Sequence, residues 1–323
     1  SSIADTLSLF GYNGVNSQSG FMSTNNSTMD VNGQGGKYDY AAQGLVSDTL
    51  NNDQLMVKNG TASLPQFNEA FLDGDNSKNT KLGEVYHNVS FPFTKAYLDT
   101  EGNVVNGNTQ GAVEYWYFDS ALTTLAMKQD ISSEGYYLKD VGHKDWSKNV
   151  NSSSQTSGVS TTYGFFPFNE TSNAASAKNY NYGFGTKIEF TFRLTDEGTV
   201  TDVNGNKVPI TFSFSGDDDV WVFIDGKLAL DVGGSHGRVT GSLDFQSKQA
   251  TISNVKASQG STDTSGNSTF SIEGQNGDVH TLTMYYMERG MWESNMRISF
   301  NFPDENLFEV ERELDTSGVD EDF

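Results

Sequence analysis

Residues 212–227, FSFSGDDDVWVFIDGK, carry the clearest structural signals in the chain. Phenylalanine and serine alternate at the start, as in a strand with one buried face. The continuous apolar run Val220–Ile224 indicates a strand that is buried on both faces. The Asp225-Gly226 pair predicts a two-residue hairpin turn into a further strand, Lys227–Asp231. Three consecutive aspartates, Asp217–Asp219, separate the first two strands.

Similar strand patterns continue on both sides of this stretch. Lys187–Leu194 alternates strictly and places its apolar residues on one face. Further strands are predicted at Val113–Phe118, Ile210–Ser215, Leu243–Phe245, Ala250–Val255, Thr269–Ile272, Thr281–Glu288 and Met296–Phe302. Turn-rich connections are predicted at Asp202–Asn206 and Ser258–Asn267. Many short strands without a strand–helix–strand rhythm predict an all-β fold, an antiparallel β-sandwich with long loops.

One or two short helices are expected beside the strands. Leu64–Leu72 is one candidate, and Ser120–Gln129 is the other, with Ser120 as its cap. Residues 1–87 are predicted to be an N-terminal elaboration packed on the sandwich, and residues 88–303 to be the sandwich itself. Residues 304–323 hold nine acidic residues and one basic residue, which indicates an acidic linker or extension.

The composition limits the classes of partner. The chain has 42 acidic and 20 basic residues and a formal net charge of −22, which disfavours nucleic acids and anionic membranes. The same charge favours divalent cations such as calcium, although a solvated acidic surface is the simpler alternative. Cysteine is absent, which excludes disulfides and thiolate metal sites. No apolar run is long enough to insert into a membrane, and the polar start Ser1–Asp5 lacks signal-peptide character, so we expect a mature or excised fragment.

The aspartates at 217–219 are the strongest candidate for chemistry. Three carboxylates between two apolar strands repel one another unless a cation lies among them. Calcium takes six to eight oxygen ligands and would remove this conflict. The small residues Ser215 and Gly216 allow the loop to fold tightly. The alternative is an ordinary acidic turn whose side chains point into water.

Several sequence blocks together resemble a known family. They are residues 164–169 (GFFPFN), 181–185 (NYGFG), 214–226, 230–236 (LDVGGSH), 286–289 (YMER) and 293–295 (ESN). They resemble the protective-antigen-type domains of bacterial toxins, glycosidases and yeast flocculin adhesins, and more closely the fibro-slime branch of these domains. The resemblance covers about residues 160–302, and residues 1–110 match only loosely. It implies a jelly-roll-like β-sandwich that acts as a binding module.

The resemblance also implies a site. In the lectin members, two adjacent aspartates joined by a cis peptide chelate calcium, and the calcium binds sugar hydroxyls. Asp217 and Asp218 match this pair, with Asp219 as a further ligand or a surface feature. A later loop, residues 288–295, would complete the site. There Asn295 is the expected side-chain ligand, Glu293 lies beside it, and Trp292 is placed to stack on a pyranose ring.

Each of the accessory residues also has a structural interpretation. Trp292 would then pack on its own domain. His236, which follows Gly233 and Gly234, lies either near the site or in a hydrogen-bonded structural position. Glu288 and Arg289 are best interpreted as an ion pair that closes the sandwich.

These observations predict an extracellular, secreted or cell-surface adhesin module without catalytic activity. It would bind calcium and, through it, a glycan or glycoprotein on a host or neighbouring cell, as part of a larger multidomain surface protein. The alternatives are a calcium-rigidified structural stalk that binds no glycan, and an appendage of a carbohydrate-active enzyme. Adjacent aspartates on one turn cannot flank a glycosidic bond. The chain also lacks nucleophile-elbow, zinc-protease and phosphate-loop motifs.

Overall fold

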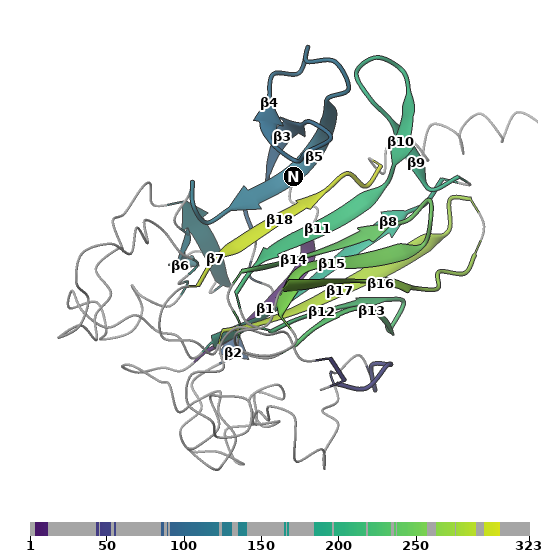
Figure 1. The fold of residues 1–323 in the computed structure, drawn as a ribbon. Helices are drawn as coiled ribbons and strands as arrows, with labels where there is room; N and C mark the ends of the chain where they lie inside the picture. The colour runs from purple at the N-terminus through teal and green to yellow at the C-terminus, as the bar shows by residue number, and fades with distance from the viewer. Residues whose placement is uncertain are drawn as a thin grey trace, which may run out of the picture.

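Two large antiparallel sheets form the body of the protein (Figure 1). The computed structural model describes residues 4–11, 43–44, 46–52, 55, 85–86, 89, 91–122, 125–130, 135–140, 165, 167, 184–195, 197–217, 219–233, 236, 238–256, 263–274, 276–288 and 294–303. The six-stranded sheet has the order β13 (Lys227–Val232), β12 (Asp219–Ile224), β17 (Val279–Glu288), β8 (Phe184–Arg193), β1 (Ala4–Gly11) and β2 (Val85–Tyr86). The eight-stranded sheet has the order β16 (Asp263–Thr269), β15 (Gln249–Lys256), β14 (Val239–Asp244), β11 (Thr211–Gly216), β18 (Met296–Phe300), β5 (Val113–Asp119), β3 (Thr94–Leu98) and β4 (Val104–Val105). Two hairpins stand apart, β6 (Leu125–Asp130) with β7 (Gly135–Asp140) and β9 (Thr199–Thr201) with β10 (Lys207–Pro209).

Phenylalanine rings fill the space between the two sheets. Phe190 of β8 contacts Phe300 of β18, with ring centroids 4.6 Å apart. Phe192 stacks on Phe302 with centroids 4.2 Å apart and planes 10° from parallel. Because β8 and β18 belong to different sheets, these contacts join the two layers. Twelve phenylalanines of the described residues belong to this core cluster, so the core is large although only 35% of the chain is hydrophobic.

The structure confirms the predicted sandwich and most of the strands inferred around residues 212–227. Every residue of β12 is buried, as expected for a strand covered on both faces. The turn between β12 and β13 has Asp225 at φ 48° and Gly226 at φ 75°, the two positive φ angles that a type I′ hairpin requires. The alternating residues of β8 also lie as predicted, with Ile188, Phe190 and Phe192 in the core.

The helix predicted over Ser120–Gln129 is wrong. Residues 120–122 form a turn, and Leu125–Asp130 is strand β6, paired with β7. The Ser120 hydroxyl does not cap a helix, because it accepts a hydrogen bond from the Met296 backbone N–H at 3.0 Å. Tertiary pairing therefore overrides the local helical preference. The other predicted helix, residues 64–72, lies outside the described residues, and no helix occurs within them.

Two polar or weakly patterned segments also form strands that the sequence did not predict. The supposed turn over Ser258–Asn267 contains β16, an edge strand made of polar residues that offer no apolar periodicity. The strand predicted over Thr269–Ile272 is not formed, because β16 ends at Thr269. Phe270 and Ile272, whose apolar character suggested a strand, are buried without being in one. Near the N-terminus, β1 pairs with β8 and extends the six-stranded sheet.

A five-residue turn with the pattern Asp-x-x-Gly-Asn occurs at two places in the described structure, residues 99–103 and 202–206. Asp202 accepts hydrogen bonds from the backbone N–H groups of residues 204 and 206 and from the Asn206 side chain. Asp99 accepts the equivalent three from residues 101 and 103. Glycine stands fourth in both turns, with φ 84° at Gly205 and 80° at Gly102, a backbone conformation that it adopts without strain. The predicted turn over residues 202–206 is thus confirmed.

We predict that Asn206 keeps the Asp202 carboxyl strongly acidic. Hydrogen bonds from the Asn206 side chain and backbone lower the pKa of Asp202 below its ordinary value of 3.8. Asn206→Ala is expected to raise the pKa of Asp202 towards 3.8, measured by NMR titration of the carboxyl carbon. Because the folded pKa is the lower one, the stabilisation is present above pH 3.8 and is lost as the pH falls through the folded value. Asn103→Ala is the matched control, which should move Asp99 and leave Asp202 unchanged.

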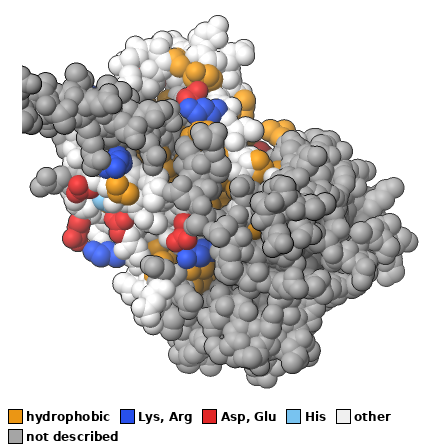
Figure 2. Space-filling model, turned by 180° about the vertical axis from the view of Figure 1, so that it is seen from behind, with side chains coloured by type: hydrophobic (Ala, Val, Ile, Leu, Met, Phe, Trp, Pro, Cys, Tyr) orange, Lys and Arg blue, Asp and Glu red, His pale blue; other side chains and the backbone are white. Residues whose placement is uncertain are grey.

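Acidic and basic side chains lie beside one another on the face shown in Figure 2, so the described part of this face does not carry one sign of charge alone. Among the residues that the structure describes, no helix has the length and apolar character needed to span a membrane.

Candidate binding site at the sheet crossovers

Three connections lead from one large sheet to the other at the same end of the sandwich. The first joins β11 to β12 between Gly216 and Asp219. The second, residues 233–238, joins β13 to β14, and the third, residues 289–295, joins β17 to β18. The predicted site residues lie in these connections or at their ends. The topology of the sandwich therefore gathers side chains that are far apart in the sequence.

The strand registers fix this convergence. Gly216, the last residue of β11, pairs with Val239 at the start of β14 and with Met296 at the start of β18. In the other sheet, Val220 near the start of β12 pairs with Val232 at the end of β13. The three connections therefore begin and end at the same end of the sandwich.

Asp217 and Asn295 are in direct contact. The Asp217 Oδ2 atom accepts hydrogen bonds from the Asn295 backbone N–H at 3.0 Å and from the Asn295 side-chain amide at 2.6 Å. The Asp217 backbone N–H donates in turn to the Asn295 carbonyl at 3.2 Å. The Asp217 side chain is only 4% exposed, so its carboxylate depends on protein partners rather than on bulk water. The structure therefore joins the two residues for which the sequence predicted a shared role.

Gly216 is required by this close approach. A Cβ atom at position 216 would lie 2.1 Å from the Asn295 carbonyl oxygen and 2.6 Å from the Phe214 ring. Real Cβ atoms do not make such contacts. The absence of a side chain at Gly216 therefore allows the first and third connections to touch.

Buried hydrogen bonds hold the residues on both sides of Asn295. Ser294 Oγ donates to the Phe165 carbonyl at 2.8 Å and lies 3.0 Å from the Tyr286 hydroxyl. The Phe165 backbone N–H donates to the Ser294 carbonyl at 2.7 Å. On the other side, Ser120 holds Met296 through hydrogen bonds in both directions. These anchors were not predicted from the sequence, although Phe165 lies in one of the blocks that carried the family resemblance.

Asp219 is not on the protein surface. It is the first residue of β12, its backbone pairs with Met287, and it is 0% exposed. Two residues further along the same strand, the fully buried Trp221 donates its indole N–H to Asp231 at 2.9 Å. The second Asp231 oxygen accepts the Gly44 backbone N–H at 2.7 Å. Trp221 is thus a buried structural residue, in agreement with the strand buried on both faces that was predicted over Val220–Ile224.

The remaining predicted residues divide into two groups. His236 is 3% exposed and precedes β14 by three residues, which places it in the second connection. Asp218, Trp292 and Glu293 lie outside the described residues, and so does the peptide bond between Asp217 and Asp218. Glu288 ends β17 opposite Phe184.

The chemistry of this end is suited to a hard cation. Carboxylate and amide oxygens are the ligands that calcium prefers, and Asp217 and Asn295, which are joined through the Asn295 amide nitrogen, carry one group of each type. Within the described part of the chain, no group of three or more His, Asp or Glu side chains forms a complete metal centre. Asp217 and Asn295 therefore fit a part of the ligand set that the sequence predicts.

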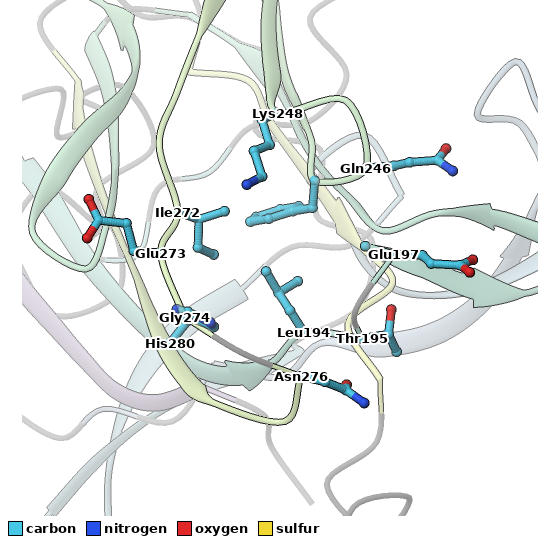
Figure 3. A pocket seen from close by; sticks show the side chains of 12 residues that line it. Leu194, Thr195, Glu197, Gln246, Lys248, Ile272, Glu273, Gly274, Asn276 and His280 are labelled. Carbon is cyan, nitrogen blue, oxygen red and sulfur yellow. The ribbon is translucent and has the colours of Figure 1, made fainter.

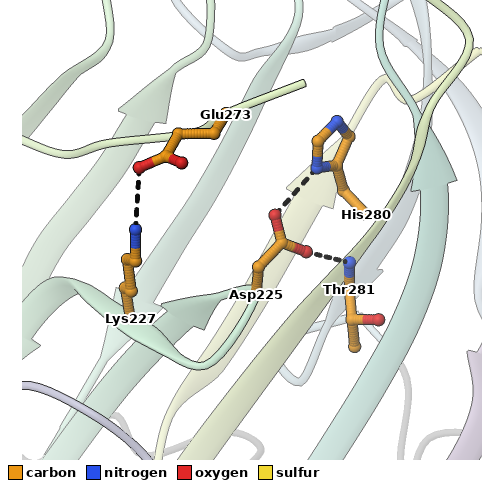
Figure 4. A network of polar contacts seen from close by, with 5 residues as sticks. All are labelled: Asp225, Lys227, Glu273, His280 and Thr281. Carbon is orange, nitrogen blue, oxygen red and sulfur yellow. Dashed lines mark hydrogen bonds and ion pairs between the residues drawn. The ribbon is translucent and has the colours of Figure 1, made fainter. Parts of the chain in front are cut away.

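The opposite end of the sandwich holds a different polar cluster. Asp225 accepts a hydrogen bond from the Thr281 backbone N–H at 2.9 Å and lies 2.8 Å from His280 Nδ1, while Lys227 pairs with Glu273 at 3.0 Å (Figure 4). A nearby cavity of about 120 Å³ is lined by side chains that include His280 and Lys248 (Figure 3). It is smaller than the roughly 300–1,000 Å³ usual for ligand pockets. The contacts of Asp225 fasten the β12–β13 hairpin to β17, and the Lys227–Glu273 pair ties it to the segment between β16 and β17.

Comparison with known proteins supports the class of domain. The family model of the PA14 domain matches residues 192–313, which confirms the protective-antigen-type resemblance over this part of the chain. The chain is similar to protein psiP of Dictyostelium discoideum, with 32% identity over 127 residues, 39% of this chain and 12% of psiP. It is also similar to psiB of the same organism, with 38% identity over 82 residues (25% of this chain, 12% of psiB), and to psiG, with 65% identity over 35 residues (11% of this chain, 5% of psiG).

The matches cover 12% or less of the length of these three relatives, so the chain corresponds to a small part of each of them. No solved structure matches the chain significantly.

Proposed function

We propose that this chain is a non-catalytic, extracellular cell-surface binding module of the fibro-slime branch that holds calcium at Asp217 and Asp218. Through the calcium it binds a glycan or glycoprotein on a host or neighbouring cell. Asn295 belongs to the same site, with Trp292 and Glu293 at its rim. When bound, the calcium would supply coordination positions for sugar hydroxyls. The chain's own residues would hold the acidic loop rigid and exclude water behind it.

The observation that carries this proposal is the contact between Asp217 and Asn295. A buried carboxylate is costly unless it is hydrogen-bonded or paired with a cation. Here Gly216 permits the contact, and Ser294 fixes Asn295 through Phe165 and Tyr286. Such preorganisation is the usual property of a binding site held on strand ends. The PA14 match and the similarity to the psi proteins favour a binding module of this class.

Neutralising Asp217 should remove the response to calcium. Saturation at about 100 times the dissociation constant stabilises a folded protein by about 2.7 kcal/mol, which corresponds to a rise of several degrees in Tm. Asp217→Asn is expected to abolish this rise in a thermal melt while preserving the shape of the side chain. Glu197→Gln is the matched control, because it also removes one negative charge, from an exposed pair with Lys207. An equal calcium response in both variants would contradict the proposed site.

A second experiment separates the lectin from the stalk. A glycan array is probed with a multivalent form of the chain at millimolar calcium, because single sites of this kind bind with dissociation constants of about 1 mM. Binding that a chelator abolishes supports the lectin. A blank array together with a retained calcium response favours the calcium-rigidified stalk.

A further inference from the structure

A hollow on the outer face of the eight-stranded sheet has the size of a ligand site. Its volume is about 480 Å³, within the roughly 300–1,000 Å³ typical of ligand pockets. It lies over β14, β11, β18 and β5, which run side by side (Figure 1). The described residues that line it include Ser213, Ser242, Thr251, Ser299 and Tyr115. We call this hollow the hydroxyl groove.

A straight row of four hydroxyls crosses the floor of the hydroxyl groove. Ser242 of β14 pairs with Thr251 of β15 on one side and with Ser213 of β11 on the other. Ser213 pairs in turn with Ser299 of β18. The residues next to them in each strand, such as Phe212, are in the core, so the hydroxyls face away from it. One small polar side chain from each of four adjacent strands therefore lines up across the sheet.

These hydroxyls are available to a ligand. Ser213, Ser242, Thr251 and Ser299 make no side-chain hydrogen bond to any residue that the structure describes. Ser299 is only 8% exposed, yet it lines the groove. A serine or threonine hydroxyl both donates and accepts hydrogen bonds. A ligand that does the same could bond to Ser299 and its three neighbours together.

The walls of the groove are held in place by other contacts. On one side stands the turn from Asp99 to Gly102, which its internal hydrogen bonds make rigid. The Arg297 guanidinium also donates to the Gly102 carbonyl and holds this turn against the sheet. Val208 and Pro209 of β10 also line the groove. The groove therefore exists before a ligand arrives, which lowers the entropic cost of binding.

The charges in the groove select against acidic ligands. Glu101 and Asp244 line it together with Asp99, and no lysine or arginine is among its described lining residues. The negative charges of these carboxylates would repel negatively charged ligands such as phosphates, uronates and sialic acids. Tyr115 adds an aromatic ring, and its hydroxyl lies 3.1 Å from Thr211 Oγ1. Burial raises the pKa of Tyr115, so its hydroxyl stays protonated and can donate.

We propose that the hydroxyl groove binds a neutral oligosaccharide directly, without calcium. A neutral sugar offers many hydroxyls that both donate and accept, which matches the row on Ser213, Ser242, Thr251 and Ser299. The acidic loop and Asn295 are not among the lining residues, so this is a site separate from the sheet crossovers. The inference does not depend on the proposed calcium function. The two would give the module two distinct contacts with a glycan.

The test measures binding of neutral oligosaccharides to the full chain in EDTA. Maltotriose, cellotriose, mannotriose and triacetylchitotriose are titrated by calorimetry and NMR, with sialyllactose as an anionic probe. At least one neutral trisaccharide is expected to bind with a dissociation constant of about 1 mM, and sialyllactose is expected not to bind. If no neutral trisaccharide binds, the proposal is wrong.

Variants then locate the binding. Ser213→Phe should fill the groove and weaken binding by about tenfold or more, equivalent to about 1.4 kcal/mol. Ser299→Ala, which removes a hydroxyl without adding bulk, should weaken it by about threefold. Ser253→Phe is the matched control, because Ser253 shares the outer face of β15 but does not line the groove. Melting curves establish that each variant is folded, and Ser242→Tyr replaces Ser213→Phe if the latter is not.

The outcomes keep the two proposals apart. Binding in EDTA that Ser213→Phe weakens and Ser253→Phe does not supports the hydroxyl groove, whatever the calcium experiments show. Equal weakening by both variants, or binding that occurs only with calcium and requires Asp217, would overturn it. The second of these results would leave the calcium proposal standing.

Discussion

Gly216→Ala is expected to lower the free energy of unfolding by about 3 kcal/mol, the upper end of the range for overpacked sites. The added methyl carbon would lie 2.1 Å from the backbone carbonyl oxygen of Asn295, and a backbone atom cannot move away as the end of a side chain can. The strand pairing of Gly216 with Met296 would have to open to make room. The same movement would separate Asp217 from Asn295, so the variant should also lose its response to calcium.

Equilibrium denaturation with urea measures this effect, and Gly266→Ala provides the control. Gly266 lies in β16, where a Cβ atom would meet no other atom within 4 Å. Alanine there should leave the stability unchanged or raise it by a few tenths of a kcal/mol, about the entropic benefit of losing a glycine. If both variants unfold at the same urea concentration as the parent chain, the contact between residues 216 and 295 is not as close as described.

Phe165→Ala is expected to cost about 3–5 kcal/mol, the usual range for removing a buried aromatic ring. The Phe165 side chain is 0% exposed. Its ring lies among those of Phe118, Tyr286 and Phe91, with centroids 5.9, 6.1 and 6.1 Å away. Three aromatic neighbours cannot easily collapse into the space of the lost ring. The backbone of residue 165 would also lose its fixed position against Ser294, which supports Asn295.

Phe165→Leu is the conservative comparison. A leucine fills most of the same space without a polar atom, so the loss should fall to about 1.5 kcal/mol or less. Chemical denaturation gives the stability of both variants, and NMR signals of the Asn295 side-chain amide report on the nearby site. A loss below about 1 kcal/mol in Phe165→Ala would contradict the packing described for this ring, because such a value is typical of exposed positions.

Local patterns predicted the strands that bury one or two apolar faces, and they failed elsewhere. β8, β11 and β12 follow directly from alternation or from a continuous apolar run. β16 is polar along its whole length and lies at a sheet edge, so no periodicity marks it. β6 has an acceptable helical sequence, and only its pairing with β7 makes it a strand. The sequence of a segment does not show which strand it will pair with, so such strands cannot be predicted from local patterns.

The candidate site, too, could be predicted only in part from the sequence. The charge repulsion among three aspartates identified the acidic loop, and the family resemblance connected it to Asn295. The contact itself depends on the register between β11 and β18, which no local pattern specifies. Ser294 and Ser120 gave no signal, because a buried serine that binds a backbone carbonyl looks like any other serine. The hydroxyl groove did give a sequence signal, because aromatic and hydroxyl side chains alternate over Phe212–Ser215. The row of hydroxyls could not be predicted from it, because the row depends on which strands lie beside β11.

The link between Asp217 and Asn295 joins positions 78 residues apart in a chain that has no cysteine. A disulfide at such a place would restrict the unfolded chain and persist after unfolding. Hydrogen bonds act only in the folded state and vanish once the two connections separate. The resistance of this end to proteases or to mechanical pulling therefore depends on how slowly the contact between Asp217 and Asn295 opens. Any ligand that bridges the two connections would slow that opening, and removal of the ligand would return the opening to its original rate.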